Sequence, residues 1–224
     1  MTDILDTVFA TERAGRFHAI GDSMQRIDAL SHTTGATKFY ADRSFPGLLH
    51  AVMVRSTEHH ALIKEIDTRA ATEVKGVHRI LTHKEVPNNW YTILKLIGVG
   101  PDDEPVLAED RVLYQGEPIL AVLASTLDAA QEAAAKVRVT YEPLPPLFDV
   151  ETAVKPETPA IKPHGRNTFM YDGRDHFHVH LGDAAAAFAG ADHVLEHTYR
   201  TSPIEQAPTE TTGCIAVPEA NGRV

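Results

Sequence analysis

The sequence predicts an α/β fold, and three neighbouring features in the middle of the chain support this prediction. An apolar run over Pro118–Ala124 follows a Gly-Glu-Pro turn. A helix pattern over Leu127–Lys136 comes next, with alanine at almost every inward position. An alternating strand over Val137–Tyr141 follows and ends before two prolines. Strand, helix and strand within about forty residues have the size of one compact α/β unit.

The residues before this unit predict further strands and one short helix. Leu48–Arg55 is apolar and β-branched enough for a strand, whereas Ala61–Asp67 could be either a strand or a short turn. Asp67–Val74 is a short helix candidate that ends at Gly76, after which Val77–Thr82 resumes as a strand.

The next residues predict a helical turn and then a loop. His83–Pro87 has the composition of a helical turn. Asn88–Pro105 is rich in glycine, proline and aspartate, so we expect a surface loop there. At the other end of the chain, residues 1–19 predict a flexible arm with a helix candidate at Ile4–Glu12.

The last third of the chain predicts two further strands around a short helix. His176–Leu181 alternates as a strand, and Asp183 is a suitable N-cap for a helix over Ala184–Ala189 that Gly190 ends. Val194–Arg200 then alternates as a second strand.

A third strand is expected over Gly213–Val217, followed by a turn at Asn221-Gly222 that favours a hairpin. The sequence stops shortly afterwards, so we expect either a fragment or a partner strand from another chain. Together these features predict four parts: an arm at 1–19, a first α/β domain at 20–147, a linker at 148–164 and the start of a second, incomplete domain at 165–224.

Composition excludes several classes of protein. A chain of 224 residues with 43% hydrophobic residues can build a sizeable core. The net charge of −10 argues against nucleic acid as a partner, because phosphate neutralisation needs clustered Lys and Arg. No apolar run reaches the roughly 18 residues of a membrane span, so none is expected. The first residues lack the basic and apolar regions of a secretory signal, so we do not expect one. Cys214 is the single cysteine, which allows neither an internal disulfide nor a cysteine-based cluster. We therefore expect a cytoplasmic protein.

Three groups of side chains are candidates for chemistry. Alternate histidines share one face of a strand and could bind zinc or copper, although a polar, solvent-facing side is favoured; they are His176, His178 and His180. His59-His60 could include an acid–base histidine, but a buried histidine bonded to backbone is favoured. Glu205 and Glu210 could form an acid–base pair around a proline, or be surface charge in a loop. We predict no metal site.

The amino-acid sequence resembles that of the large, molybdopterin-binding subunits of the xanthine dehydrogenase/aldehyde oxidase family. The stretch 104–146 is similar to part of their α/β hammerhead domain, so we expect a mixed sheet with flanking helices as in that domain. Gly182–Thr201 resembles the strand–helix–strand that opens their molybdopterin domain. The matches cover roughly residues 20–218. Further family residues match at similar intervals near the N-terminus: Gly21 and Ser23, Arg26 and Asp28, Thr34 and Gly35, Tyr40 and Asp42, Ser56, His60-Ala61, and Asp67.

The resemblance implies an oxidative hydroxylation of an aldehyde or N-heterocycle with water as the oxygen source. It implies molybdopterin in the complete enzyme, with iron–sulfur clusters and FAD on partner subunits, because only about twenty residues precede the matching region. The remainder of the molybdenum subunit, the iron–sulfur and flavin subunits and a small-molecule substrate are the implied partners. We expect none of these cofactors to bind this chain alone.

The resemblance also guides the interpretation of the segment around Glu210. Some members of the family place a cofactor-contacting glutamine six residues before the matching glutamate, where this sequence has Ile204. Gln206 is nearby but out of register, and it is our candidate cofactor-binding residue. Glu210 is expected to position the loop. The family's catalytic glutamate and its glycine-rich pterin loops match no part of this chain, so we predict no catalytic residue and no activity for the chain alone.

Two other hypotheses remain open. The chain could be a non-catalytic binding or assembly module that docks iron–sulfur or flavin partners. It could also be a metal-binding protein that uses the alternate histidines of 176–180.

Overall fold

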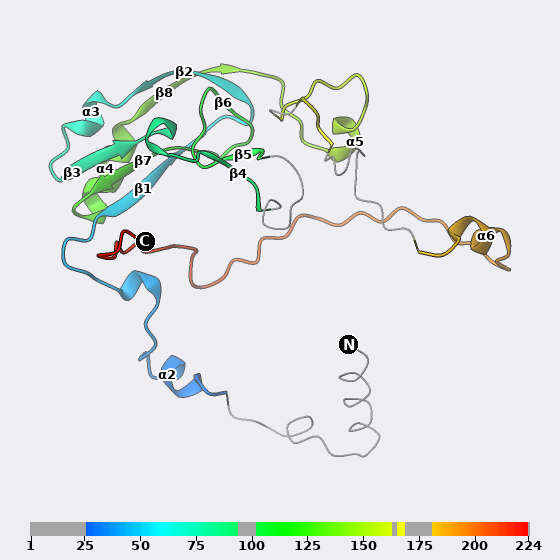
Figure 1. Ribbon diagram of the computed structural model, residues 1–224, viewed down its shortest axis with the longest axis horizontal. Helices are drawn as coiled ribbons and strands as arrows, with labels where there is room; N and C mark the ends of the chain where they lie inside the picture. The colour runs from blue at the N-terminus through cyan, green and yellow to red at the C-terminus, as the bar shows by residue number, and fades with distance from the viewer. Residues whose placement is uncertain (1–25, 94–101, 163–164, 169–180, 224) are drawn as a thin grey trace. The chain divides into compact units, whose positions relative to one another are not determined.

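Figure 1 shows a computed structural model of the chain, which describes residues 26–93, 102–162, 165–168 and 181–223. These residues divide into two compact units. One unit joins the described residues up to Ser44 with those from Arg200 onwards, and the other is Phe45–Tyr199. Within the described residues, no helix has the length and apolar character to cross a membrane.

The larger unit is built on a three-stranded antiparallel sheet in the order β1-β7-β3. Its strands are β1 (His50–Arg55), β7 (Pro118–Ala124) and β3 (Val77–Leu81). Both outer strands pair with the centre of β7, where Val122 lies opposite Val52 on one side and Ile80 on the other. All three predicted strands are confirmed.

A second antiparallel sheet has the order β6-β2-β8. Its strands are β6 (Arg111–Val112), β2 (Ala61–Asp67) and β8 (Arg138–Pro143). The sequence left Ala61–Asp67 open between a turn and a strand, and the structure shows a strand that pairs with both neighbours.

Helix α4 (Leu127–Lys136) covers one face of the first sheet (Figure 1). Its first turn is capped by Thr126, whose hydroxyl accepts a hydrogen bond of 3.2 Å from the backbone N–H of Ala129. Ala130 and Ala133 face inward and are fully buried, so the small alanine side chains let the helix lie close to the strands. The helix was predicted with these bounds.

Alternate residues of β7 enter two separate cores, which explains why the strand is apolar throughout. Consecutive side chains of a strand point to opposite faces, so Ile119 and Leu120 belong to different clusters. The first cluster comprises Ala71, Val74, Leu120, Val122 and Ala133. The second comprises Ala61, Ala108, Val112 and Ile119.

Short helices confirm three other predictions. Helix α3 (Arg69–Thr72) lies inside the predicted range, and Gly76 after it adopts a φ of +96°. A 3₁₀ turn, η2 (His83–Glu85), occupies the predicted helical turn. Helix α6 (Ala184–Ala189) has the predicted bounds; the Asp183 carboxylate accepts from the N–H of Ala186 at 2.9 Å.

The structure corrects the expected sheet architecture. Every strand pair among the described residues is antiparallel, so the expected mixed sheet is wrong. The strands on either side of α4 also belong to different sheets, because β8 pairs with β2 and not with β7. The unit is an α/β fold in which one helix connects two antiparallel sheets.

Two segments predicted to be irregular contain short elements. The loop at Asn88–Pro105 includes a pair of two-residue strands, β4 (Trp90–Tyr91) and β5 (Glu104–Pro105). The linker contains helix α5 (Val150–Ala153), whose first turn is capped by the carboxylate of Asp149. Local composition missed both because neither element is longer than one turn or one strand pair.

The C-terminal predictions are partly wrong. Val194–Arg200 and Gly213–Val217 alternate in sequence but form no strand, because neither pairs with another described segment. The turn at Asn221-Gly222 is present, with Gly222 at φ +81° and a hydrogen bond of 2.8 Å from the N–H of Glu219 to the carbonyl of Arg223. The helix candidate at 4–12 and most of the strand at 176–181 lie outside the described residues.

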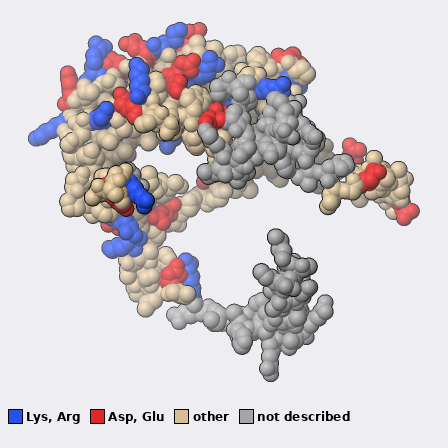
Figure 2. Space-filling view, viewed as in Figure 1, with Lys and Arg blue, Asp and Glu red and all other residues tan. Residues whose placement is uncertain are grey.

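The smaller unit contains helix α2 (Ala29–Thr33) and the 3₁₀ turn η1 (Tyr40–Asp42). On the face seen in Figure 2, acidic and basic side chains are interspersed over the larger unit and form no continuous field of one sign.

Candidate functional site

The segment at 201–213 was expected to approach a cofactor, and its backbone has an unusual bend. Residues 201–208 belong to no helix or strand, and Ala207 adopts a φ of +45°. This left-handed conformation costs a residue with a side chain about 1–2 kcal/mol. The carboxylate of Glu205 accepts a hydrogen bond of 3.3 Å from the N–H of Ala207 across the bend.

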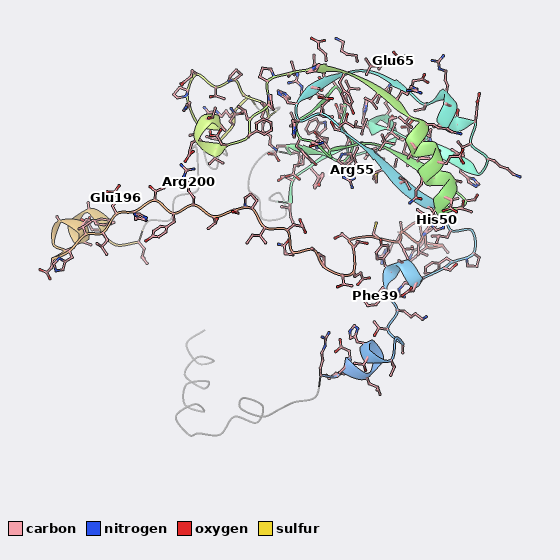
Figure 3. The ribbon with its side chains drawn as sticks, turned by 180° about the vertical axis from the view of Figure 1, so that it is seen from behind. Phe39, His50, Arg55, Glu65, Glu196 and Arg200 are labelled. Atoms are coloured by element: carbon pink, nitrogen blue, oxygen red, sulfur yellow. The ribbon has the colours of Figure 1, made fainter. Side chains whose placement is uncertain are left out.

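Tyr40 contacts this 201–213 segment at several points. Its backbone N–H donates to the Oε1 atom of Glu210 at 3.0 Å, and its hydroxyl lies 3.4 Å from the hydroxyl of Thr211. A Cβ atom added to Gly213 would lie 2.3 Å from two carbons of the tyrosine ring, so the ring occupies the space that a side chain there would need. Figure 3 shows the turn beside Phe39, which precedes Tyr40, next to the C-terminal segment.

Glu210 therefore has a structural partner 170 residues earlier in the chain. The sequence predicted that Glu210 positions its loop, and this bond is consistent with that role. It did not predict Tyr40 as the partner. The only available signal was that both residues lie in stretches that resemble the same family.

Gln206, the candidate cofactor-binding residue, is exposed, and so is Ile204 at the position where some relatives place a glutamine. The amide of Gln206 carries two donors and one acceptor. The structure thus leaves this side chain accessible to a ligand, and its proposed role stays a prediction.

The 201–213 segment fits only part of the cofactor that the resemblance implies. An exposed amide suits the neutral, hydrogen-bonding part of a pterin. The phosphate of such a cofactor calls for Lys, Arg or a helix N-terminus, yet residues 201–222 contain no Lys or Arg and three glutamates, Glu205, Glu210 and Glu219. Among the described residues, no group of three His, Cys, Asp or Glu could hold a metal ion. The phosphate and the metal therefore need groups beyond these.

The larger unit contains a cavity of about 290 Å³ between the β4–β5 pair and the start of β7. A buried carboxylate lines it: Glu117 is 2% exposed and accepts a hydrogen bond from the backbone N–H of Leu113. Burial raises the pKa of Glu117, and this hydrogen bond offsets part of that rise. Lys162 also lines the cavity and lies 3.4 Å from the carboxylate of Asp103.

The other polar groups of this cavity hold its walls together. The Glu109 carboxylate accepts from Trp90 Nε1 at 2.6 Å and from the side chain of Asn89 at 3.0 Å. Asn89 also exchanges two hydrogen bonds with the backbone of Leu107. Because these groups satisfy one another, the arrangement is that of a structural polar network.

The turn before β7 is fixed by the end of β1. The guanidinium of Arg55, seen at the end of β1 in Figure 3, donates to the carbonyl of Gly116 at 2.9 Å. Ser56 donates its N–H to the carbonyl of Glu117 at 2.8 Å and accepts from the N–H of Gly116 at 2.9 Å. Ser56 is one of the residues that carry the family resemblance, and its role here is structural.

His60 is the structural histidine that the sequence favoured. It is 9% exposed, and its Nδ1 atom lies 2.7 Å from the carbonyl of Pro145. His59 instead contacts the ring of Phe148 edge-on, with 5.1 Å between the ring centroids. The alternate histidines, His176, His178 and His180, lie outside the described residues.

Comparison with known families explains the fold. Residues 34–145 match the model of the aldehyde oxidase and xanthine dehydrogenase a/b hammerhead domain. Residues 163–224 match the molybdopterin cofactor-binding domain. The chain belongs to the aldehyde oxidase and xanthine dehydrogenase family.

Relatives of this family match most of the chain. It is 36% identical over 187 residues to the nicotinate dehydrogenase large molybdopterin subunit of Eubacterium barkeri, a match that covers 83% of this chain and 41% of that protein. It is 33% identical over 211 residues to the 6-hydroxypseudooxynicotine dehydrogenase complex subunit gamma of Paenarthrobacter nicotinovorans, covering 89% of this chain and 25% of that protein. The chain thus spans less than half the length of either relative.

A solved structure shows the same fold. The aldehyde oxidoreductase from Desulfovibrio gigas is similar with a TM-score of 0.63 and 31% sequence identity. The match covers 77% of this chain and 19% of that one. The predicted α/β hammerhead fold is confirmed.

Proposed function

We propose that this chain is the N-terminal portion of the large subunit of a molybdenum hydroxylase. The complete enzyme would oxidatively hydroxylate an aldehyde or N-heterocycle and take the new oxygen atom from water. The observation that carries the proposal is the order of two family matches, a hammerhead domain at 34–145 and a molybdopterin domain at 163–224. Matches in this order also fit relatives that are named as molybdopterin and dehydrogenase subunits.

The protein and its cofactor would have separate tasks. The molybdenum cofactor, when bound, supplies the oxidation and the transfer of oxygen. In this chain, the hammerhead domain provides scaffold and subunit contacts, and the 201–213 segment provides one wall near the cofactor. Gln206 would offer its amide to the neutral part of the pterin, while Glu210 holds the segment in place. No residue of this chain is proposed to react with the substrate.

The remaining partners follow from the same proposal. Electrons would leave through iron–sulfur clusters and FAD, which we place on separate, cytoplasmic partner subunits. The single cysteine of these 224 residues cannot itself bind such a cluster. The relatives' names, which describe subunits of complexes, support separate chains.

The decisive experiment is to purify the native complex that contains this sequence and to measure its molybdenum by elemental analysis. The intact mass of the subunit is determined in the same sample, and turnover is assayed with aldehydes and N-heterocycles and an artificial electron acceptor. A complex purified from molybdate-free medium is the control. Molybdenum together with hydroxylation supports the proposal. A complex without molybdenum and without turnover overturns it and leaves an assembly module.

A further inference from the structure

The turn η1 presents one backbone donor to the 201–213 segment. The first N–H groups of a helical turn have no acceptor within the turn and need one from elsewhere. The carboxylate of Asp42 accepts from the N–H of Phe39 at 3.1 Å. The next N–H, that of Tyr40, donates to Glu210 at 3.0 Å. The turn thus places its second donor on a carboxylate that is distant in sequence.

A second contact fixes the same residue. The ring of Tyr40 fills the position that a Cβ atom of Gly213 would occupy, at 2.3 Å from the ring carbons Cε2 and Cζ. Only glycine allows this approach. Glu210 and Gly213, three residues apart, therefore hold Tyr40 through its backbone and through its ring.

These contacts lie just after the bend that carries Gln206. Ala207 has a φ of +45°, and a residue stays in such a sparsely populated conformation only when its surroundings hold it there. On the C-terminal side of the bend, the Tyr40 contacts at Glu210 and Gly213 are the restraints that the structure shows.

We propose that Tyr40 is a positioning residue for the 201–213 segment: through Glu210 and Gly213 it sets the direction in which Gln206 projects. That Gln206 projects toward a cofactor rests on the proposed function, whereas the restraint by Tyr40 does not. Tyr40 would thereby control the geometry of a part of the site without being proposed as a ligand itself.

The restraint can be tested in the full chain by hydrogen exchange. Replacing Glu210 by alanine removes the acceptor of the Tyr40 N–H, so exchange of that amide should rise about tenfold. Glu210→Gln keeps a carbonyl oxygen at the same distance and should restore most of the protection. Glu219→Ala is the matched control, because its carboxylate accepts from the side chain of Asn221 at 3.1 Å and makes no hydrogen bond with Tyr40 among the described residues. Equal exchange in the Ala and Gln variants of Glu210 overturns the restraint.

The ring contact is tested by a pair of substitutions. Gly213→Ala should displace the ring and raise amide exchange across 205–213 several-fold, and Tyr40→Ala should do the same. If both substitutions act by removing the same contact between the Tyr40 ring and Gly213, the double variant should exchange no faster than Tyr40→Ala alone. The effects of substitutions at residues in contact are not additive. Gly190→Ala is the control, because a Cβ there meets only ordinary contact at 3.5 Å. Additive effects in the double variant contradict the proposal.

The role toward the cofactor is tested separately in the molybdenum-loaded complex. Glu210→Ala should change the electron paramagnetic resonance signal of the metal and lower kcat, and Glu210→Gln should recover both. An unchanged signal in Glu210→Ala, with the exchange result intact, refutes the positioning role at the cofactor. A complex that contains no molybdenum refutes the proposed function instead, and the hydrogen-exchange results decide the restraint without it.

Discussion

Leu120 offers the strongest test of how the larger unit is held together. It lies at the centre of β7, is fully buried and packs in the cluster with Val122 and Ala133. Leu120→Ala removes about three methylene-sized groups at about 0.8 kcal/mol each. The cavity left behind raises the expected loss of unfolding free energy to about 3–4 kcal/mol. That is a large part of the roughly 5–15 kcal/mol by which domains are stable.

The assay is urea unfolding followed by the fluorescence of Trp90, the one tryptophan of the chain. Its indole N–H donates to Glu109 at 2.6 Å, so its surroundings change when the unit unfolds. Met53→Ala is the control on the neighbouring strand β1, because Met53 is 43% exposed and should lose under about 1.5 kcal/mol. A loss below about 1 kcal/mol for Leu120→Ala, or one equal to that of the control, would refute the assignment of Leu120 to the core.

Three further substitutions test single contacts of the same unit. His60→Phe keeps a ring but loses the hydrogen bond to the Pro145 carbonyl, so urea unfolding should show a loss of about 1 kcal/mol; an unchanged midpoint would contradict that bond. Burial raises the pKa of Glu117, so the folded state binds its proton more tightly and unfolding free energy falls as pH rises from the unfolded pKa through the folded one. Glu117→Gln should flatten this fall in urea titrations at several pH values, and an unaltered pH profile would argue against a buried carboxyl. Gly76→Ala places a Cβ at 2.8 Å from Ser125 Oγ on a backbone with φ +96°. Thermal unfolding should therefore show that the free energy of unfolding falls by about 1–3 kcal/mol. An unchanged free energy would contradict this strain and show that the turn relaxes freely.

Sequence patterns predicted the elements of the larger unit well, because their period and caps are local. The continuous apolar run of β7 and the alanine face of α4 with its Thr126 cap each determine one structure. The arrangement of these elements was harder to predict. Nothing local indicates that β8 pairs with β2 rather than with β7, since pairing depends on residues far apart in the chain.

The predictions of strands at Val194–Arg200 and Gly213–Val217 were wrong for a related physical reason. Alternation shows only that a segment suits a sheet, whereas a strand also needs a neighbour for its backbone hydrogen bonds. Neither segment has such a neighbour within the ranges that the structure describes.

The candidate site was predicted only in part. Burial of His60 and its bond to backbone follow from its place beside a strand, and both are confirmed. The contact between Tyr40 and Glu210 joins residues 170 positions apart, so no spacing rule could reveal it. Gln206 remains a prediction because exposure alone does not identify a ligand.

The pairing of strands that are far apart in the sequence has a consequence for synthesis of the protein. His50 pairs with Ala124 and Ala61 with Pro143, so the early strands β1 and β2 leave the ribosome long before their partners exist. At about 5–20 residues per second, that delay is roughly 4 to 16 seconds. During this time both strands have unpaired backbone edges and are open to aggregation. The nascent chain should therefore depend on chaperones until β8 has emerged, and slow folding is the expected result of such distant contacts.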